Sequence, residues 1–424
     1  MNERLLQYIW QFQYFNNKEL QLCTGESLQI IHPGQGNIHQ GPDFQQATIK
    51  IGETKWVGNI ELHVQTSDWF RHAHQHDKNY NSVILHVVWN HDREEVISSI
   101  PILALHDKVP KLLLYQYEAW MMQPFFIPCG ENISTVNSII WTSWKERLLI
   151  ERLERKTNNI ASYLSQCNQH WEEIFWWLLA RNFGIKVNAE SFESMARSLP
   201  LQILAKHKNQ IIQLESLLMG QAGLLENHFE EKYPRMLQKE YGFYKKKYKL
   251  EKIREPIHFL RMRPENFPTV RLAQLAMLIH QSSHLFTRVL ELSSVNEAKS
   301  FLNITANDYW HYHYMPDEVS SFKPKKLGDQ MANNIVINTI VPAIYAYGHL
   351  QGRNSYKDKA LKWLGEITGD ENTIIEKFRQ SGIACKTAFD TQSILELKDQ
   401  YCDKRRCLDC AVGNSILKRN SGGL

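Results

Sequence analysis

The sequence has little net charge, and it lacks both a long apolar run and an N-terminal signal pattern. Its 49 basic residues nearly balance its 45 acidic ones, and a formal charge of +4 is too small to argue nucleic-acid binding by itself. No stretch reaches the roughly 18 apolar residues of a membrane-spanning helix. The first residues lead into an amphipathic segment and not into the apolar core of a signal peptide. We therefore expect a cytoplasmic protein without a membrane partner.

Cysteine is scarce, and its count is odd. Seven cysteines in 424 residues favour reduced thiols or metal ligands over disulfides. With 43% hydrophobic and 11% aromatic residues the chain can bury large cores, and its length exceeds what one core usually organises. We expect an α/β domain over residues 1–130 and an all-helical domain over residues 138–424. The sequence does not indicate an oligomeric state.

One strand carries the first candidate site. Residues 56–65 alternate so that Glu61 and His63 share one face, while an apolar face packs on the core and leaves the Glu61/His63 face free. A short turn separates this strand from residues 43–51, which predicts a hairpin and brings Asp43 into the same neighbourhood. Two carboxylates and an imidazole suit a hard divalent ion such as Mg²⁺.

The order Pro42-Asp43, an intervening strand and Glu61-x-His63 resembles the core motif of the PD-(D/E)XK nuclease superfamily, with His63 where that motif usually has Lys. The expected elements follow the α-β-β-β-α-β order of the superfamily core. They are a helix over 3–16, strands over 27–31, 43–51 and 56–65, a short helix over 68–79 and a strand over 83–90.

The resemblance implies a restriction-endonuclease-like mixed sheet and a metal-dependent nuclease that hydrolyses phosphodiester bonds in nucleic acid. Asp43 and Glu61 would hold Mg²⁺ or Mn²⁺, and His63 would orient the attacking water or take its proton. Glu26 is a candidate for a further carboxylate. A mostly neutral imidazole cannot stabilise phosphate charge as the usual Lys does, so the site is weak, altered or inactive in this interpretation.

A second candidate site follows directly. Asp68, His72 and His76 fall at i, i+4 and i+8 of the expected short helix, and such a face can bind Zn²⁺, Fe or Mn²⁺. With His63 these residues would define a Zn- or Fe-dependent hydrolase acting on another substrate. A solvated helix face explains the same spacing. His86, inside an apolar strand, is expected to be a core histidine. A third interpretation is an inactive scaffold that binds nucleic acid or protein.

Nearly the whole chain also resembles a family of uncharacterised bacterial proteins, which implies no activity. The residues that carry this resemblance are Gly41-Pro42-Asp43-Phe44, Gly58-Asn59-Ile60-Glu61-Leu62-His63-Val64, Ser67-Asp68-Trp69, Arg261-Met262-Arg263-Pro264-Glu265-Asn266-Phe267-Pro268 and the cysteine-rich tail.

Helical periodicity dominates from about residue 138 onward, including an aromatic segment over 171–179 that we expect to be buried. Within this part, Lys245, Lys246 and Lys247 with Arg261 and Arg263 could follow a phosphodiester backbone. Interleaved acidic residues favour an ordinary solvated helix end.

The tail contains a C-x₄-C-x₂-C motif. Cys402, Cys407 and Cys410, with Cys385 as the candidate fourth ligand, could hold Zn²⁺ or an iron–sulfur cluster. Neighbouring basic residues would favour the thiolate form. Plain reduced cysteines explain the motif equally well. The tail resembles the cluster loop of helix-hairpin-helix DNA glycosylases only loosely, because those loops have four cysteines and longer spacings.

Overall fold

The computed structural model describes residues 1–420 apart from 38–39, 94–99, 123–124 and 283. The chain divides into two compact units. The first unit contains Met1–Trp144, Gln380–Ile383 and Leu397–Leu424, and the second contains Lys145–Arg379 and Ala384–Glu396. The cysteine motif, expected from the sequence in the helical domain, is therefore part of the first unit.

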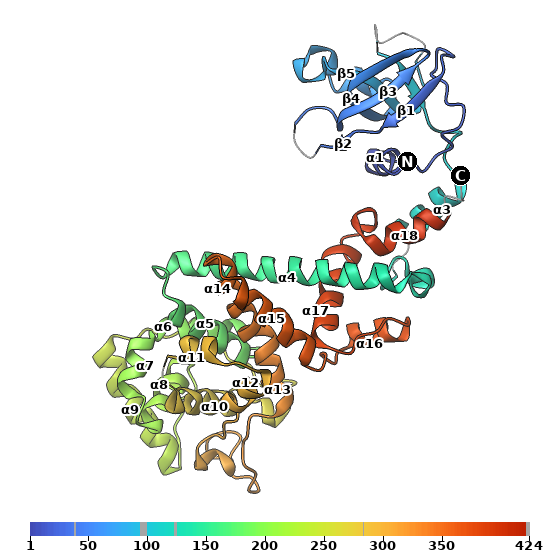
Figure 1. The fold of residues 1–424 in the computed structure, drawn as a ribbon. Coiled ribbons are helices and arrows are strands. Elements are labelled where there is room, and N and C mark those ends of the chain that lie inside the picture. The colour runs from blue at the N-terminus through green and yellow to red at the C-terminus, as the bar shows by residue number, and fades with distance from the viewer. Residues whose placement is uncertain (38–39, 94–99, 123–124, 283, 421–424) are drawn as a thin grey trace. The chain divides into compact units, whose positions relative to one another are not determined.

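The first unit is built on a mixed sheet with the strand order β1-β3-β4-β5-β6, and β2 pairs with β3 outside this path (Figure 1). Strands β1, β3 and β4 are antiparallel neighbours, whereas β4, β5 and β6 run parallel. The expected α/β mixed sheet is confirmed. Its strands are β1 (Leu28–His32), β2 (Gln35–Gly36), β3 (Phe44–Ile51), β4 (Thr54–Gln65), β5 (Val83–Asn90) and β6 (Ile102–Ala104).

Helix α1 (Glu3–Gln11) packs beside β4. It begins after Asn2, whose side-chain oxygen accepts a hydrogen bond from the Leu5 N–H at 2.8 Å and so satisfies a free donor of the first turn. Its buried face includes Leu6, Ile9 and Trp10. The polar residues Glu3 and Gln7, spaced by one turn, are only half-buried.

A β-bulge sets the register between β3 and β4. Phe44 pairs with Ile60 but Ala47 pairs with Gly58, so β3 has one extra residue in this interval. Gln46 accommodates the bulge with a backbone φ of 57°. Its backbone N–H donates to the Asn59 side-chain oxygen at 3.2 Å. A one-residue shift reverses which face a side chain occupies. The bulge therefore decides which residue of β3 lies beside Glu61.

The connection from β4 to β5 is irregular, and the prediction of one helix over 68–79 was wrong. Helix α2 (Asp68–Arg71) ends after one turn because Ala73 has a φ of 58°, which a right-handed helix cannot accommodate. Two 3₁₀ turns follow, over His74–His76 and Lys78–Tyr80. These turns return the chain to β5, which is buried along most of its length as expected for a central strand.

The first unit is completed by helices from both parts of the chain. Helix α3 (Lys111–Met122) contacts α18 (Ala411–Asn420), and the Arg405 guanidinium donates to the Trp120 carbonyl at 2.8 Å. A 3₁₀ segment over Gly130–Thr135 and the first residues of α4 also belong to this unit.

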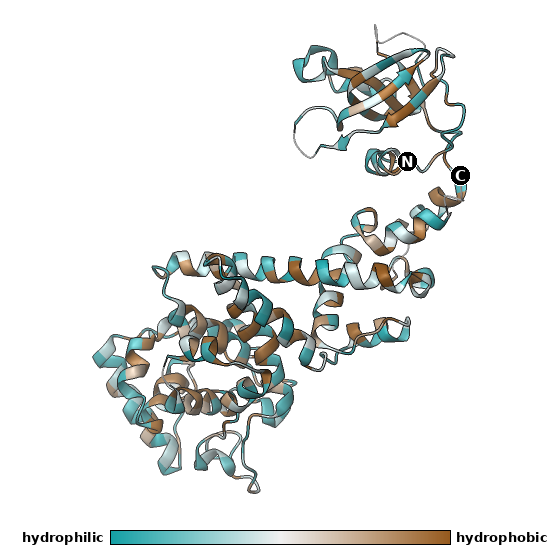
Figure 2. Cartoon of the chain, in the orientation of Figure 1, coloured by the Kyte–Doolittle hydropathy of each residue, from teal (hydrophilic) through white to brown (hydrophobic). Residues whose placement is uncertain are grey.

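The second unit is helical, as predicted, and its elements bury a large shared core that includes Trp176, Trp310 and Trp363. Figure 2 shows apolar and polar residues alternating along these helices. Within the part of the chain that the structure describes, no helix has both the length and the apolar character to cross a bilayer. The helices are α4 (Ser138–Gln166), which begins in the first unit, α5 (Trp171–Phe183), α6 (Ala189–Ser198), α7 (Leu201–His207), α8 (Ile211–Gln221), α9 (Lys232–Tyr248), α10 (Pro268–Gln281), α11 (Leu285–Glu291), α12 (Val295–Phe301), α13 (Asp329–Ile335), α14 (Val341–Leu350), α15 (Asn354–Glu366), α16 (Thr373–Gln380) and α17 (Ala388–Glu396).

Candidate metal site on the sheet

Asp43 and Glu61 meet at the junction of β3 and β4. The Asp43 N–H donates to Glu61 Oε2 at 3.1 Å, and the Leu62 N–H donates to Asp43 Oδ2 at 3.0 Å. The Gln7 amide, from α1, donates to Asp43 Oδ1 at 2.8 Å. Each carboxylate is therefore fixed in place by the backbone or side chains of neighbouring elements.

Burial changes the acidity of both carboxyl groups. It is the main reason why the pKa of Glu61 rises to about 8, and the charge of Asp43 raises it further. Burial likewise raises the pKa of Asp43 to about 6, with a smaller contribution from the charge of Glu3. Glu3 thus lies close enough for its charge to raise the pKa of both carboxyl groups. Glu26, the candidate for a further carboxylate, is exposed and accepts a hydrogen bond from Thr24. Ionising the pair without a cation is unfavourable.

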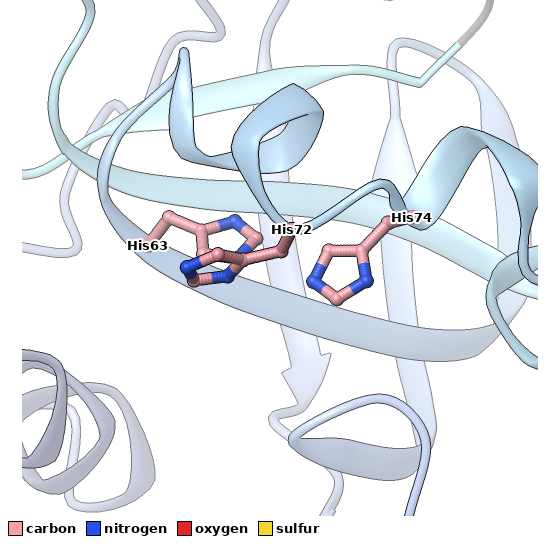
Figure 3. Close-up of side chains that lie close together, drawn as sticks. All are labelled: His63, His72 and His74. Carbon is pink, nitrogen blue, oxygen red and sulfur yellow. The ribbon is translucent and has the colours of Figure 1, made fainter.

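Three imidazoles, those of His63, His72 and His74, lie close together (Figure 3). His63 comes from β4, and His72 and His74 come from the connection to β5; one ligand atom from each lies within 4.8 Å of the others. His63 Nε2 is 3.1 Å from His72 Nδ1. Glu61 Oε1 lies 3.6 Å from His63 Nε2 and 3.3 Å from His74 Nε2. A carboxylate and three imidazoles therefore converge.

His63, His74 and His86 are held in their neutral form. Burial is the first cause that lowers the pKa of His63 to about 2, and neighbouring histidines lower it further. Burial also lowers the pKa of His86 to about 3 and lowers the pKa of His74. Neutral imidazole is the form that binds a metal ion. Consequently His63 cannot provide the fixed positive charge of a lysine.

His86 is a partner of the site and a core residue at once. Fully buried on β5, it lies with Nε2 2.8 Å from His63 Nδ1. Contacts of this kind fix the ring orientation of a metal-ligating histidine. Trp69 packs edge-on against His63 at 6.4 Å between ring centroids, and His74 stacks on Tyr80 at 3.8 Å. The expectation of a free Glu61/His63 face was wrong, because the β4–β5 connection covers it and leaves both residues buried.

The second site expected from the sequence is arranged differently. Asp68 is buried, accepts the Gln65 N–H at 3.0 Å and pairs with Arg71 at 2.5 Å. Asp68 thereby stabilises the turn at the start of α2. His76 is exposed. The third histidine whose ring nitrogen lies close to those of His63 and His72 is His74. The helix break at Ala73 replaces the expected i, i+4, i+8 spacing with a pair two residues apart.

The basic residues proposed for nucleic-acid contact lie in the second unit. Lys245, Lys246 and Lys247 are exposed in the last turn of α9, where Lys247 approaches the Tyr248 ring at 5.2 Å. Arg261 and Arg263 are exposed in the loop that precedes α10. They are therefore on a different element from the lysines.

The tail cysteines and Cys385 fall in different units. Cys402, Cys407 and Cys410 belong to the first unit, and all three are buried. Cys385 belongs to the second unit. Burial raises the pKa of its thiol, and the charges of Lys145, Asp390 and Arg379 also affect that pKa. The residue that joins the tail cysteines is Cys129, which the sequence motif does not reveal because it lies far away along the chain.

Fold and site together define a class of protein. It combines an all-helical unit with an α/β unit in which a buried carboxylate and histidine of the mixed sheet meet two histidines of the β4–β5 connection. The chain belongs to the family described as "Protein of unknown function (DUF2851)", whose model matches residues 3–373. The cysteine motif lies beyond the matched residues. No curated protein and no solved structure gives a significant match to the chain.

Proposed function

We propose that the first unit is a metal-dependent phosphodiesterase of the PD-(D/E)XK type that acts on nucleic acid. The order α1, β1, β3, β4, α2, β5 is the order that the resemblance implies. Asp43 at the start of β3 and Glu61 and His63 in β4 occupy the positions of the motif. The convergence of Glu61 with His63, His72 and His74 is the observation that carries the proposal.

The ion is bound by His63, His72 and His74, with Glu61 beside it. Three neutral imidazoles favour Mn²⁺, Zn²⁺ or Fe²⁺ over Mg²⁺, which prefers oxygen ligands. Three protein ligands leave a position for water, as in catalytic zinc sites. His63 is then a ligand and not a substitute for the lysine, which accounts for an imidazole at that position.

The chemistry follows from this arrangement. A divalent ion held by these residues would supply Lewis-acid polarisation of the scissile phosphate and a water of lowered pKa. The Glu61 carboxylate, 3.3 Å from His74 and 3.6 Å from His63, is placed to accept the proton of that water. Asp43 positions Glu61 through its backbone N–H, while the Gln7 and Leu62 donors hold its own carboxylate.

A second candidate keeps the same reaction but places Mg²⁺ between Asp43 and Glu61. The observation in its favour is that burial and mutual repulsion raise the pKa of Glu61, so that a cation between the two acids would relieve an unfavourable interaction. In that arrangement the histidines support the site without binding the ion.

Metal content and nuclease activity of the full chain test the proposal. We expect His72→Ala to lose about one tightly bound transition-metal ion per chain relative to the wild type, and His76→Ala, a matched exposed histidine of the same connection, to retain it. Cleavage of single- and double-stranded oligonucleotides should fall at least ~10²-fold in Glu61→Gln. It should stay unchanged in Glu53→Gln, because that exposed carboxylate on the β3–β4 turn pairs only with Lys50 among the contacts described.

The alternatives give different results. Activity that needs Mg²⁺, is lost in Asp43→Asn and survives His72→Ala would select the carboxylate site. A bound transition metal without cleavage of any nucleic acid would support a hydrolase for another substrate. If neither bound metal nor cleavage is found in the wild-type chain, the sheet is a scaffold and the proposed function is wrong.

A further inference from the structure

Four buried cysteines of the first unit face one small cavity. Cys129 follows the segment after α3, whereas Cys402, Cys407 and Cys410 come from the tail, and all four line the cavity together with Tyr401, Arg406 and Gly413. Each is at most 9% exposed. The thiols of Cys129, Cys407 and Cys410 all lie near enough to that of Cys402 to interact with it electrostatically.

The spacing of the sulfurs argues against a single zinc ion. Zn–S bonds near 2.3 Å would hold the sulfurs of a tetrahedral site only about 4 Å apart. In the described part of the chain, no three cysteine sulfurs lie within 4.8 Å of one another. An iron–sulfur cluster places iron and sulfide atoms between its cysteine ligands and so keeps those ligands farther apart.

The surroundings suit a group with net negative charge. The positive charge of Arg405 lies near the Cys407 sulfur, and that of Lys398 lies near the Cys402 sulfur. Each charge favours a negatively charged sulfur. The N–H groups of Val412 and Gly413, at the N-terminus of α18, donate to the Cys410 sulfur. Hydrogen bonds to ligand sulfurs and nearby cations are what stabilise such clusters.

Gly413 allows this close approach. A Cβ atom at position 413 would lie 2.4 Å from the Cys407 carbonyl oxygen, closer than real contacts permit. The absence of a side chain lets the first turn of α18 pack directly on the loop that presents Cys407 and Cys410. The loop and the helix therefore form one compact, built site.

We propose that Cys129, Cys402, Cys407 and Cys410 bind a [4Fe–4S] cluster that ties the end of the chain to the first unit. Binding transfers a preassembled [4Fe–4S]²⁺ cluster from a carrier protein: four Fe–S bonds to the carrier thiolates break, four form to these cysteines, and the four thiol protons pass to the released carrier thiolates, with no change of oxidation state. The role assigned is structural, because the four ligands come from segments far apart in the sequence and the cluster fixes one to the other. The inference is independent of the proposed hydrolase.

The test is the composition of the full chain purified without oxygen from iron-supplied cells. We expect about four iron and four acid-labile sulfide per chain, a broad visible absorption band and an electron paramagnetic resonance signal after reduction. Cys129→Ser should lower the iron and sulfide content to background. Two controls should retain it: Cys385→Ser, a buried cysteine of the other unit, and Cys23→Ser, an exposed one.

Three outcomes overturn the cluster: about one zinc per chain that persists in His72→Ala and is lost in Cys129→Ser, no iron and no acid-labile sulfide in the wild-type chain, or a Cys129→Ser chain that keeps as much iron as Cys385→Ser. Should Cys129→Ser fail to fold, the wild-type iron, sulfide and zinc contents still decide between these outcomes. His72→Ala must leave the visible absorption unchanged, which separates this site from the histidine cluster.

Discussion

Glu61→Gln should make the metal-free protein more stable at high pH. The pKa of Glu61 rises from 4.5 to about 8 in the folded chain, so the folded state holds the proton more tightly than the unfolded state does. The sign follows from linkage: between pH 4.5 and 8 the folded state binds more protons, and stability falls as the pH rises through this window. Glutamine imitates the protonated acid and cannot ionise. It therefore removes this loss.

The size of the effect comes from the same shift. Each pKa unit corresponds to about 1.4 kcal/mol, so the rise from 4.5 to about 8 means that ionising Glu61 costs on the order of 5 kcal/mol above pH 8. For a unit of this size, each kcal/mol moves the Tm by roughly 2–4 °C. In EDTA, the Tm of the variant should match that of the wild type near pH 5 and exceed it by about 10 °C near pH 9.

Differential scanning calorimetry of both full chains across this pH range makes the measurement. Both proteins share every other titrating group, so the difference between their Tm values isolates Glu61. The transition of the helical unit, which does not contain this residue, serves as an internal reference. A difference that is equal at pH 5 and pH 9 would refute the buried, unpaired carboxylate.

Three further predictions concern other parts of the chain. Adding Mn²⁺ or Zn²⁺ should raise the Tm of the first unit more at pH 8 than at pH 6, because the ion compensates the ionised Glu61; a pH-independent rise in calorimetry would contradict this. Gly58→Ala should destabilise the sheet by about 2 kcal/mol or more in urea unfolding, since its Cβ would lie 2.4 Å from Ile84 Cγ2, while Gly242→Ala, with open space around it in α9, should be neutral or stabilising. Trp310→Phe should cost about 1–3 kcal/mol by the same measurement, because it removes the indole N–H that donates to the fully buried Glu215 at 3.0 Å; an unchanged urea midpoint would show that the hydrogen bond contributes nothing.

Much of the architecture could be predicted from local pattern. The alternation in residues 56–65 and the apolar run at 83–90 correspond to β4 and β5, and the long amphipathic segment corresponds to α4. Periodicity failed where backbone geometry is special. Helices α13 and α14 are joined by a π-helical segment over Val336–Ile340, which ordinary helical periodicity does not predict, and the helix expected over 68–79 stops at the left-handed Ala73.

The site was harder to predict than the strands that carry it. The sequence places Asp43, Glu61 and His63 near one another, and the structure brings Asp43 to Glu61 and Glu61 to His63. Gln7 joins them from a helix packed across the sheet, and His74 joins them only because the connection turns at Ala73. Such tertiary contacts leave no periodic signal. Cys129 was missed for the same reason, although an unpaired buried cysteine outside the motif was the available signal.

The discontinuous make-up of the first unit has a consequence for synthesis. Residues from Leu397 onward belong to the first unit, although in the sequence the helical unit lies between them and the residues of the sheet. A ribosome therefore synthesises the helical unit before it synthesises Leu397–Leu424, the residues that complete the first unit. Helix α3 cannot make its contacts with α18 until translation is nearly complete. Premature termination anywhere after residue 144 would release a chain whose earliest-made segment still lacks its partner.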